Sequence, residues 1–200
     1  MSKQHLAPTL AALAIGATLG ACATPAYVSP TEVTRFTGAT PAELARGTIS
    51  IEPAPGIDGN SLEYGIFRAE LADELSALGY DVIDTGGRQT AVLGIEQFVS
   101  EADRRGPVSV GGGVGAGSYG SGVGLGVGID LSGRAADRVD TEVAVFIRPD
   151  AGGGNLWEGR ARFVATVDSE FSDPARAADK ALAALFTDFP GRSGETIEVE

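Results

Sequence analysis

The sequence is poor in the side chains that many enzymes use for catalysis. Its 200 residues include one histidine, His5, and one cysteine, Cys22. Triad hydrolases need histidine as the general base, and zinc and haem sites take histidine or cysteine as ligands. A single cysteine also excludes an intrachain disulfide. We therefore expect a protein that is not an enzyme and that has no cofactor and no metal site.

Basic residues are also scarce. The chain has 15 lysines and arginines against 27 aspartates and glutamates, which gives a formal net charge of -12. Nucleic-acid binding depends on clustered basic side chains that neutralise phosphates, so we expect no nucleic-acid partner. The same imbalance argues against electrostatic adhesion to anionic lipids. A membrane attachment would therefore need a covalent anchor.

The first 22 residues have the three-part pattern of a bacterial export signal. Lys3 supplies positive charge, an uncharged and largely apolar run follows, and small residues precede Cys22. A transmembrane helix needs about 20 apolar residues, and this run is shorter. Leu19-Gly20-Ala21-Cys22 resembles a lipobox, the site where bacterial lipoproteins are cleaved and lipidated. We predict a signal peptide over residues 1–21, cleavage between Ala21 and Cys22, and lipidation of Cys22, with palmitate among its acyl chains. The alternative is a plain secretory signal with an incidental cysteine.

The residue after the cysteine indicates the destination. In well-studied bacteria an aspartate there favours retention in the inner membrane, and this chain has Ala23. We therefore expect a lipoprotein of the outer membrane that faces the periplasm and contacts the membrane through its lipid. Residues 22–30, which contain Pro25 and Pro30, are expected to form a tether between membrane and domain.

Hydrophobic periodicity predicts a single α+β domain over residues 31–190. Alternating patterns predict strands near residues 31–36, 48–52, 80–83, 91–99, 139–147 and 157–167. Helical spacing predicts two helices, one from a cap at Asn60 to Gly79 with Leu62 on its apolar face, and one from Asp173 to Pro190. We expect an antiparallel sheet of about five to seven strands with both helices packed on one face. Residues 191–200 are predicted to be an acidic tail.

The segment 106–133 is unusually rich in glycine. Ten glycines lie between Val110 and Ile129, and in a helix they would cost about 10 kcal/mol relative to alanine. Apolar residues alternate with glycine instead, which predicts a β-hairpin with its turn near residues 118–122. Gly115 to Gly120 matches the dinucleotide pattern G-x-G-x-x-G, but that motif needs a helix after it, so we expect no such site. A contact surface for another envelope protein is a further possible role of the hairpin.

Two other groups of residues invite a functional interpretation. Trp157 is predicted to anchor a strand in the core rather than to bind a ligand. Acidic residues that could form catalytic or calcium-binding pairs are Asp137, Asp140 and Glu142, and Asp168 with Glu170. Alternating spacing on strands favours a solvated face for them, and the sequence has no EF-hand loop.

Several short motifs together resemble the bacterial envelope lipoproteins grouped as domain of unknown function 4136 (DUF4136). They are Val33-Thr34-Arg35-Phe36, the capped helix leading to Gly79-Tyr80, the glycine-rich segment with Tyr119, and the segments 156–161 and 185–190 with Trp157 and Phe189-Pro190. The resemblance covers nearly the whole mature chain. It implies an α+β fold, and it implies no established activity and no catalytic residues.

These observations leave three functions open. The one we expect is a structural or partner-binding module of the envelope, with another envelope protein as a partner. The second is a periplasmic binder of a small or lipidic ligand, held between the sheet and the glycine-rich hairpin. The third is a hydrolase that uses carboxylates, which would need two facing acidic side chains with raised pKa values.

Overall fold

The computed structural model describes residues 26–101, 108–115, 122–129 and 136–200. The chain divides into two compact units. One contains residues 26–101 and 136–200, and the described residues between 102 and 135 belong to the other. The single domain expected over residues 31–190 is therefore interrupted by the glycine-rich segment. The predicted signal peptide, residues 1–21, lies outside the described residues.

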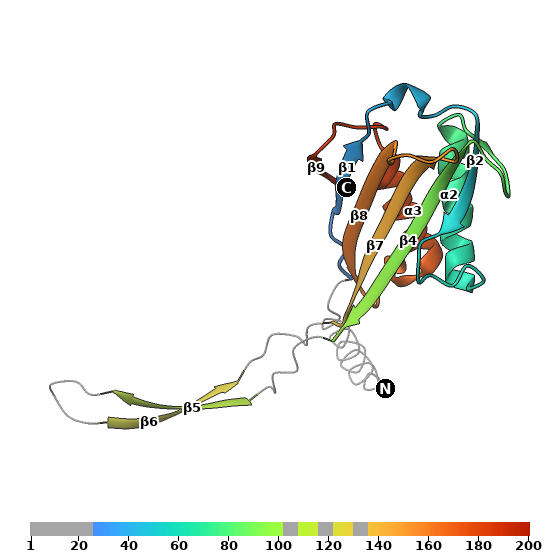
Figure 1. The fold of residues 1–200 in the computed structure, drawn as a ribbon. Helices are drawn as coiled ribbons and strands as arrows, with labels where there is room; N and C mark the ends of the chain where they lie inside the picture. The colour runs from blue at the N-terminus through green and yellow to red at the C-terminus, as the bar shows by residue number, and fades with distance from the viewer. Residues whose placement is uncertain (1–25, 102–107, 116–121, 130–135) are drawn as a thin grey trace, which may run out of the picture. The chain divides into compact units, whose positions relative to one another are not determined.

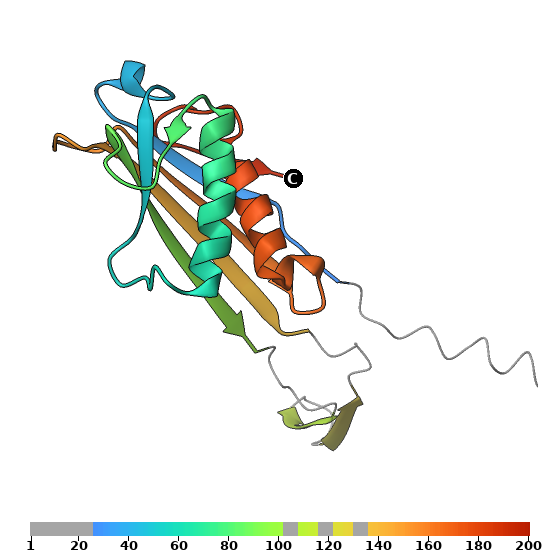
Figure 2. The ribbon, with the colours of Figure 1, turned by 90° about the vertical axis from the view of Figure 1, so that its right-hand side faces the viewer.

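The larger unit is a seven-stranded sheet covered on one face by two helices (Figures 1 and 2). Its strands are β1 (Thr31–Thr37), β2 (Thr48–Pro53), β3 (Asp81–Val82), β4 (Gln89–Ser100), β7 (Arg138–Pro149), β8 (Trp157–Thr166) and β9 (Glu195–Val199). Their order in the sheet is β3-β2-β4-β7-β8-β1-β9. Short 3₁₀ turns lie at Pro41–Glu43 and Glu170–Ser172. This architecture confirms the predicted α+β fold class.

Most neighbouring strands are antiparallel, as predicted, and β2 is the exception. It runs parallel to both β3 and β4. The first helix, α2 (Leu62–Ala77), lies between β2 and β3 in the chain, and a helical crossover brings the following strand back in the same direction. The sheet is therefore mixed. Hydrophobic alternation identifies the strands but carries no information about the direction of their pairing.

Side-chain caps start both helices. The Ser61 hydroxyl of α2 accepts the N–H of Tyr64 at 3.1 Å, so the cap is one residue later than the predicted Asn60. Gly79 ends the helix with a positive φ of 103°, a conformation that favours glycine. In α3 (Pro174–Phe186) the Asp173 carboxylate accepts the N–H of Ala175 at 3.0 Å, as the sequence predicted. Neither helix is long and apolar enough to cross a bilayer.

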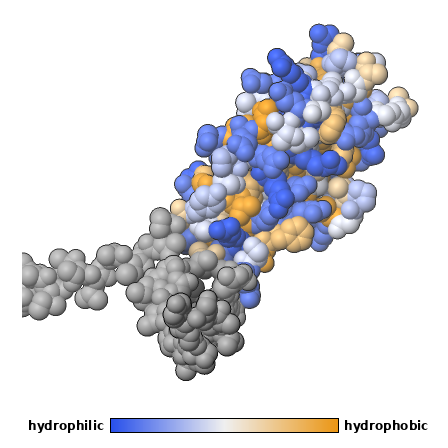
Figure 3. Space-filling model, turned by 90° about the vertical axis from the view of Figure 1, so that its left-hand side faces the viewer, coloured by the Kyte–Doolittle hydropathy of each residue, from blue (hydrophilic) through white to orange (hydrophobic). Residues whose placement is uncertain are grey.

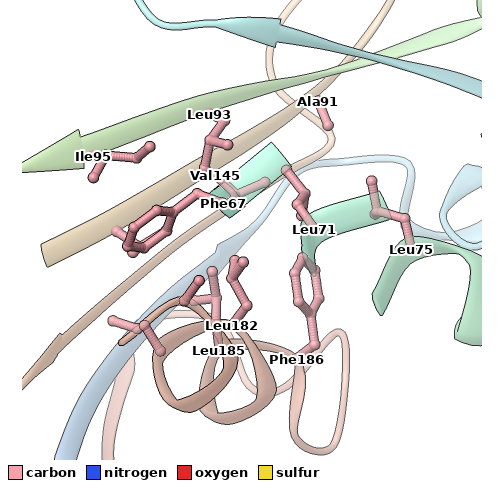
Figure 4. Close-up of a cluster of buried hydrophobic side chains, with 14 of the residues drawn as sticks. Phe67, Leu71, Leu75, Ala91, Leu93, Ile95, Val145, Leu182, Leu185 and Phe186 are labelled. Carbon is pink, nitrogen blue, oxygen red and sulfur yellow. The ribbon is translucent and has the colours of Figure 1, made fainter. Parts of the chain in front are cut away.

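The hydrophobic core lies between the sheet and the helices (Figure 4). Its fully buried members include Phe67, Leu71, Leu75, Leu93, Leu182 and Leu185. Leu62 was expected on the same apolar face, but it is 90% exposed. Its five-residue spacing from Phe67 places it about 140° away around the helix, at 3.6 residues per turn. Leu62 therefore points away from the core.

The C-terminal residues belong to the sheet. Glu195–Val199 forms β9, which pairs antiparallel with β1. Ile197 and Val199 are partly buried against the core. The prediction of an acidic tail over residues 191–200 is therefore wrong, because the alternation of Ile197 and Val199 outweighs the glutamates between and around them.

The smaller unit contains a two-stranded antiparallel ribbon of β5 (Val108–Gly115) and β6 (Gly122–Ile129). Val110 is in register with Val127, and Gly111 with Gly126. The predicted hairpin strands are thus confirmed, and residues 116–121, most of the predicted turn, lie outside the described residues. Alternate positions of a strand belong to opposite faces, so the register puts the apolar positions of both strands on one face and mostly glycine on the other.

Candidate functional site

The later part of the segment 22–30, which was expected to form a tether, is bound to the sheet. Thr166 donates its N–H to the carbonyl of Tyr27 at 2.9 Å, and Tyr27 donates its N–H to the Thr166 hydroxyl at 2.9 Å. Val28 forms a β-bridge with Ala165 and packs against the core. Any tether is therefore confined to the residues before Tyr27. The predicted cleavage and lipidation residues, Ala21 and Cys22, lie outside the described residues, and Cys22 stands five positions before Tyr27.

Three strands meet beside this segment, at an end of the sheet that we call the stem end (Figure 1). Ser100, the last residue of β4, lies opposite Arg138, the first residue of β7. Arg138 in turn lies opposite Thr166, the last residue of β8. The chain leaves this unit after Glu101 and returns to it at Ala136, so the inserted segment 102–135 and the N-terminal segment both join the unit at the stem end.

Both helices also begin at the stem end. α3 follows β8 after one short turn, and its first residues lie near the same end of the sheet as the tip of β4 (Figure 2). In α2, Phe67 lies beside Ile95 whereas Leu75 lies toward Ala91 (Figure 4). Because β4 runs from Gln89 to Ser100, the first turn of α2 lies toward the stem end.

Large apolar side chains are exposed at this end. Phe98 is 61% exposed, Val99 67% and Tyr27 50%. Val167 belongs to the same end, since its N–H donates to the carbonyl of Asp137 at 3.0 Å. Among the residues that the structure describes, the exposed large apolar side chains are Tyr27, Phe36, Leu62, Ile66, Phe98, Val99 and Val167. All except Phe36, which lies near the opposite end of β8, are at or near the stem end.

Charged side chains border the exposed apolar ones. The guanidinium of Arg138 lies 6.0 Å from the centre of the Tyr27 ring, within cation–π range. Arg162 binds the Asp140 carboxylate through two hydrogen bonds, one of them 2.9 Å from Nε. These hydrogen bonds, together with the negative charge of Asp140, raise the pKa of Arg162. The stem end therefore combines exposed apolar groups with Arg138 beside the Tyr27 ring and with Arg162 paired to a carboxylate.

Two of the acidic residues considered as functional pairs are paired with arginines. Asp140 is bound to Arg162, and Glu170 lies 3.8 Å from Arg176. Asp140 and Glu142 alternate along β7 with the buried Val139, Thr141 and Val143, so they belong to the face of the sheet opposite to the core. Within the described parts of the chain, no group of three or more acidic, histidine or cysteine residues could hold a metal ion.

A different set of carboxylates has perturbed pKa values. Burial raises the pKa of Glu70 and of Glu74 on α2, and the negative charges of Asp179 and Asp73 raise both further. Sequence analysis missed this group because Asp179 comes from α3, and the packing of the two helices brings it near. These carboxylates lie on the helices and do not line either of the surface hollows described below.

The segments that carry the most specific part of the family resemblance come together in space. Trp157 is fully buried, and its ring stacks on Phe186 with 5.4 Å between centroids. Phe189 contacts the same indole at 5.1 Å. The indole N–H donates to the carbonyl of Pro190 at 2.9 Å. The prediction that Trp157 anchors the core is confirmed, and the motif is structural.

A buried arginine lies beyond this cluster. Arg35 is 3% exposed and borders a surface hollow of about 410 Å³. Burial lowers the pKa of Arg35, and the carboxylates of Asp188 and Glu195 oppose that shift. Nε of Arg35 has no hydrogen-bond partner in the described part of the chain. The other lining residues of the hollow are Pro190, Gly191, Arg192 and Ile197. A second hollow, of about 620 Å³, lies around Arg46, Arg88 and Asp150.

Comparison with known proteins gives a relative in sequence. The chain is 31% identical to the uncharacterized protein ZMO1243 of Zymomonas mobilis, over 86% of this chain and 80% of that protein. No family model matches the chain, and membership of DUF4136 stays a prediction.

Solved structures are more distant. A PDZ domain protein of Parabacteroides distasonis is similar with a TM-score of 0.50 and 10% identity, over 94% of this chain. The chain spans 42% of that protein's length, and the likeness concerns the fold alone. The PelC dodecamer of Paraburkholderia phytofirmans has a TM-score of 0.43 and 14% identity, over 82% of this chain and 99% of that one.

Proposed function

The chain belongs to the same family as the Zymomonas mobilis protein ZMO1243, and we propose that it is a lipoprotein of the outer membrane, anchored through Cys22. Its folded unit faces the periplasm and acts by binding another envelope protein, without catalysis. The observation that carries this proposal is the lipobox-like Leu19-Gly20-Ala21-Cys22, which ends five residues before the chain enters the sheet at Tyr27.

The position of the cysteine supports an anchor over an incidental thiol. A few residues must separate a lipidated Cys22 from the folded unit, so that the acyl chains can enter the membrane. The sheet captures the chain at Tyr27 through backbone hydrogen bonds. Residues 22–26 are therefore enough to separate a lipid from the sheet without a long linker, and two acyl chains are enough for stable attachment.

The surface supports binding over chemistry. The face of the sheet opposite to the helices is open to solvent and largely hydrophilic (Figure 3). It carries ion pairs between neighbouring strands, such as Arg148 with Glu52 at 3.2 Å and Arg162 with Asp140. The sequence after Cys22 contains no histidine and no other cysteine. A face that carries both signs of charge can make complementary contacts with the charges of a protein partner.

The proposal is tested by expressing the full chain in a diderm bacterium with labelled palmitate and separating the two membranes. We expect the wild-type chain to take up label and to sediment with the outer membrane. Cys22→Ser should take up no label and leave the membrane fraction. Ala23→Asp is the matched control, since it keeps the thiol and should keep the label while moving the protein to the inner membrane.

Each part of the proposal can fail separately in these cells. A wild-type chain without labelled palmitate would overturn the anchor. A labelled chain that formed no crosslink to any envelope protein in intact cells, and whose deletion left the envelope unchanged, would overturn the binding role. Binding of a small or lipidic ligand stays a prediction, because both hollows described above are surface features bordered by ionisable side chains.

A further inference from the structure

We propose that the stem end is a membrane-contact surface, which seats the folded unit directly on the lipid bilayer that holds Cys22. The surface consists of Tyr27, Phe98, Val99 and Val167. Leu62 and Ile66, in the first turns of α2, lie toward the same end. This inference rests on the proposed lipid anchor, and it adds an orientation that the anchor alone does not supply. The ligand is the lipid surface itself, in the zone where headgroups meet acyl chains.

The reach of the chain limits which surface can touch the membrane. Tyr27 stands five positions after Cys22, and even a fully extended chain spans at most about 18 Å over five positions. The twelve residues of β4 extend over about 40 Å at 3.3 Å per residue. A lipid on Cys22 therefore keeps the stem end near the bilayer surface. When the strands stand away from the bilayer, the opposite end of the unit is too far from it to make contact.

The distribution of apolar side chains matches that limit. Six of the seven exposed large apolar residues in the described part of the chain gather at or near the stem end. Concentrated apolar exposure on a soluble surface marks an interaction site, whereas scattered single residues do not. Tyr27 adds the amphipathic ring that is enriched where headgroups meet acyl chains. Its neighbour Arg138, at 6.0 Å, is a cation suited to lipid phosphates.

The charge balance indicates how the contact is made. The chain carries a formal net charge of -12, so it gains nothing overall from an anionic bilayer. Arg162 on β8 is already bound to Asp140, and Arg176 in the first turn of α3 lies 3.8 Å from Glu170. Apolar insertion rather than surface charge must therefore hold the unit on the membrane. Contact of the folded unit with the membrane should depend only weakly on the fraction of anionic lipid.

Site-specific quenching tests this orientation in the lipidated full chain. Cys22 is the only cysteine and is blocked by its lipid, so Phe98→Cys introduces a unique thiol for an environment-sensitive fluorophore. Phe36→Cys is the matched control, because Phe36 is also an exposed strand phenylalanine, 45% against 61%, at the other end of the unit. Each labelled protein is reconstituted in phosphatidylethanolamine–phosphatidylglycerol vesicles that contain nitroxide-bearing phosphatidylcholine. Circular dichroism checks that both variants fold.

We expect lipid-borne nitroxide to quench the label at position 98 about threefold or more beyond the label at position 36, as for a side chain at headgroup depth. The order should persist when phosphatidylglycerol is replaced by phosphatidylcholine. Equal quenching at the two positions in a protein that carries its lipid would overturn the orientation and leave the anchor standing. A protein that takes up no labelled palmitate would overturn both. Val99→Cys gives a second probe with the same expected result.

Discussion

Gly159 on β8 shows how a single missing side chain can fix a packing arrangement. A β-carbon at this position would lie 2.8 Å from a methyl group of Leu185 and 2.8 Å from Cζ2 of Trp157. Both neighbours are fully buried, so neither can move into solvent. The absence of a side chain at Gly159 is therefore what allows the indole to lie flat beneath α3.

We predict that Gly159→Ala destabilises the protein. Overpacking a filled core costs about 1–3 kcal/mol, and urea unfolding followed by circular dichroism would measure it. Gly154→Ala is the control, because no atom lies within 4 Å of its added β-carbon, and its effect should stay within about 0.5 kcal/mol. A Gly159→Ala protein as stable as the Gly154→Ala protein would mean that the indole can shift at little cost.

Single residues also mark where sequence reasoning works and where it stops. The alternating pattern of β8 was enough to place Trp157 in the core. Alternation on β1 likewise places Arg35 on the buried face, in line with Thr31 and Val33. Nothing in the neighbouring sequence indicates that a buried guanidinium can be tolerated there. The carboxylates of Asp188 and Glu195 that oppose its change in pKa come from segments about 150 residues later in the chain.

Among the secondary-structure elements, α2 carries an unfavourable cluster of negative charge. Glu70 and Glu74 lie one turn apart, and burial together with Asp179 and Asp73 raises the pKa of each. The folded state therefore takes up a proton at a higher pH than the unfolded chain does. By linkage, these groups lower stability as pH rises from about 4.5 through the raised pKa, and the loss is complete at neutral pH.

We predict that Glu74→Gln stabilises the protein at pH 7 and has little effect near pH 4. Like charges one turn apart on a helix cost about 0.2–0.5 kcal/mol, which sets the expected gain. Thermal unfolding at several pH values would measure it. Glu63→Gln removes the same charge from the first turn of α2, where a negative charge is favourable, and should not stabilise. A pH-independent gain for Glu74→Gln would point to a cause other than ionisation.

Strand identity was more predictable than strand pairing. The patterns of β4, β7 and β8 each alternate over many residues, and all three were located from sequence. The parallel direction of β2 and the pairing of β9 with β1 depend on contacts between distant residues. Glu195–Val199 follows a loop after the last helix, and its partner strand lies at the other end of the sequence, so no local pattern could indicate the pairing.

In the whole molecule, the seven-stranded unit is continuous across the inserted segment. Ser100 and Arg138 are register partners, so the two ends of the insertion lie side by side. The hydrophobic core of this unit is formed by residues of its own strands, helices and loops. The sheet and its helices therefore contain what is needed to bury the core.

We predict that replacing residues 102–135 with Asn-Gly leaves the larger unit folded. Glu101 and Ala136 would then be joined by a short hairpin loop of a common length. The entropic cost of closing a connection falls slightly as the connection becomes shorter. Tm should therefore change by no more than about 4 °C, roughly 1 kcal/mol for a domain of this size. Calorimetry of the full chain and the variant compares them. Loss of cooperative unfolding would show that the fold needs the insertion.

One part of the candidate site could be predicted from local sequence and the other could not. Cys22 could be singled out because a lipobox is a short contiguous pattern. The stem end could not, since Tyr27, Phe98 and Val167 are far apart in sequence and are brought together by the register of β4, β7 and β8. Sequence reasoning placed Tyr27 in the tether and Leu62 on the apolar face of its helix, so neither was expected in an exposed apolar surface.

The enclosed indole of Trp157 has a practical consequence. It is the only tryptophan in the chain, and it touches α3 and the segment after it through Phe186 and Phe189. Its ultraviolet emission therefore serves as an intrinsic optical reporter, blue-shifted while the C-terminal part of the chain is docked and red-shifted once water reaches the ring. Docking of α3 and the segment after it onto Trp157 can therefore be followed in real time, in detergent or in vesicles, without attaching a dye.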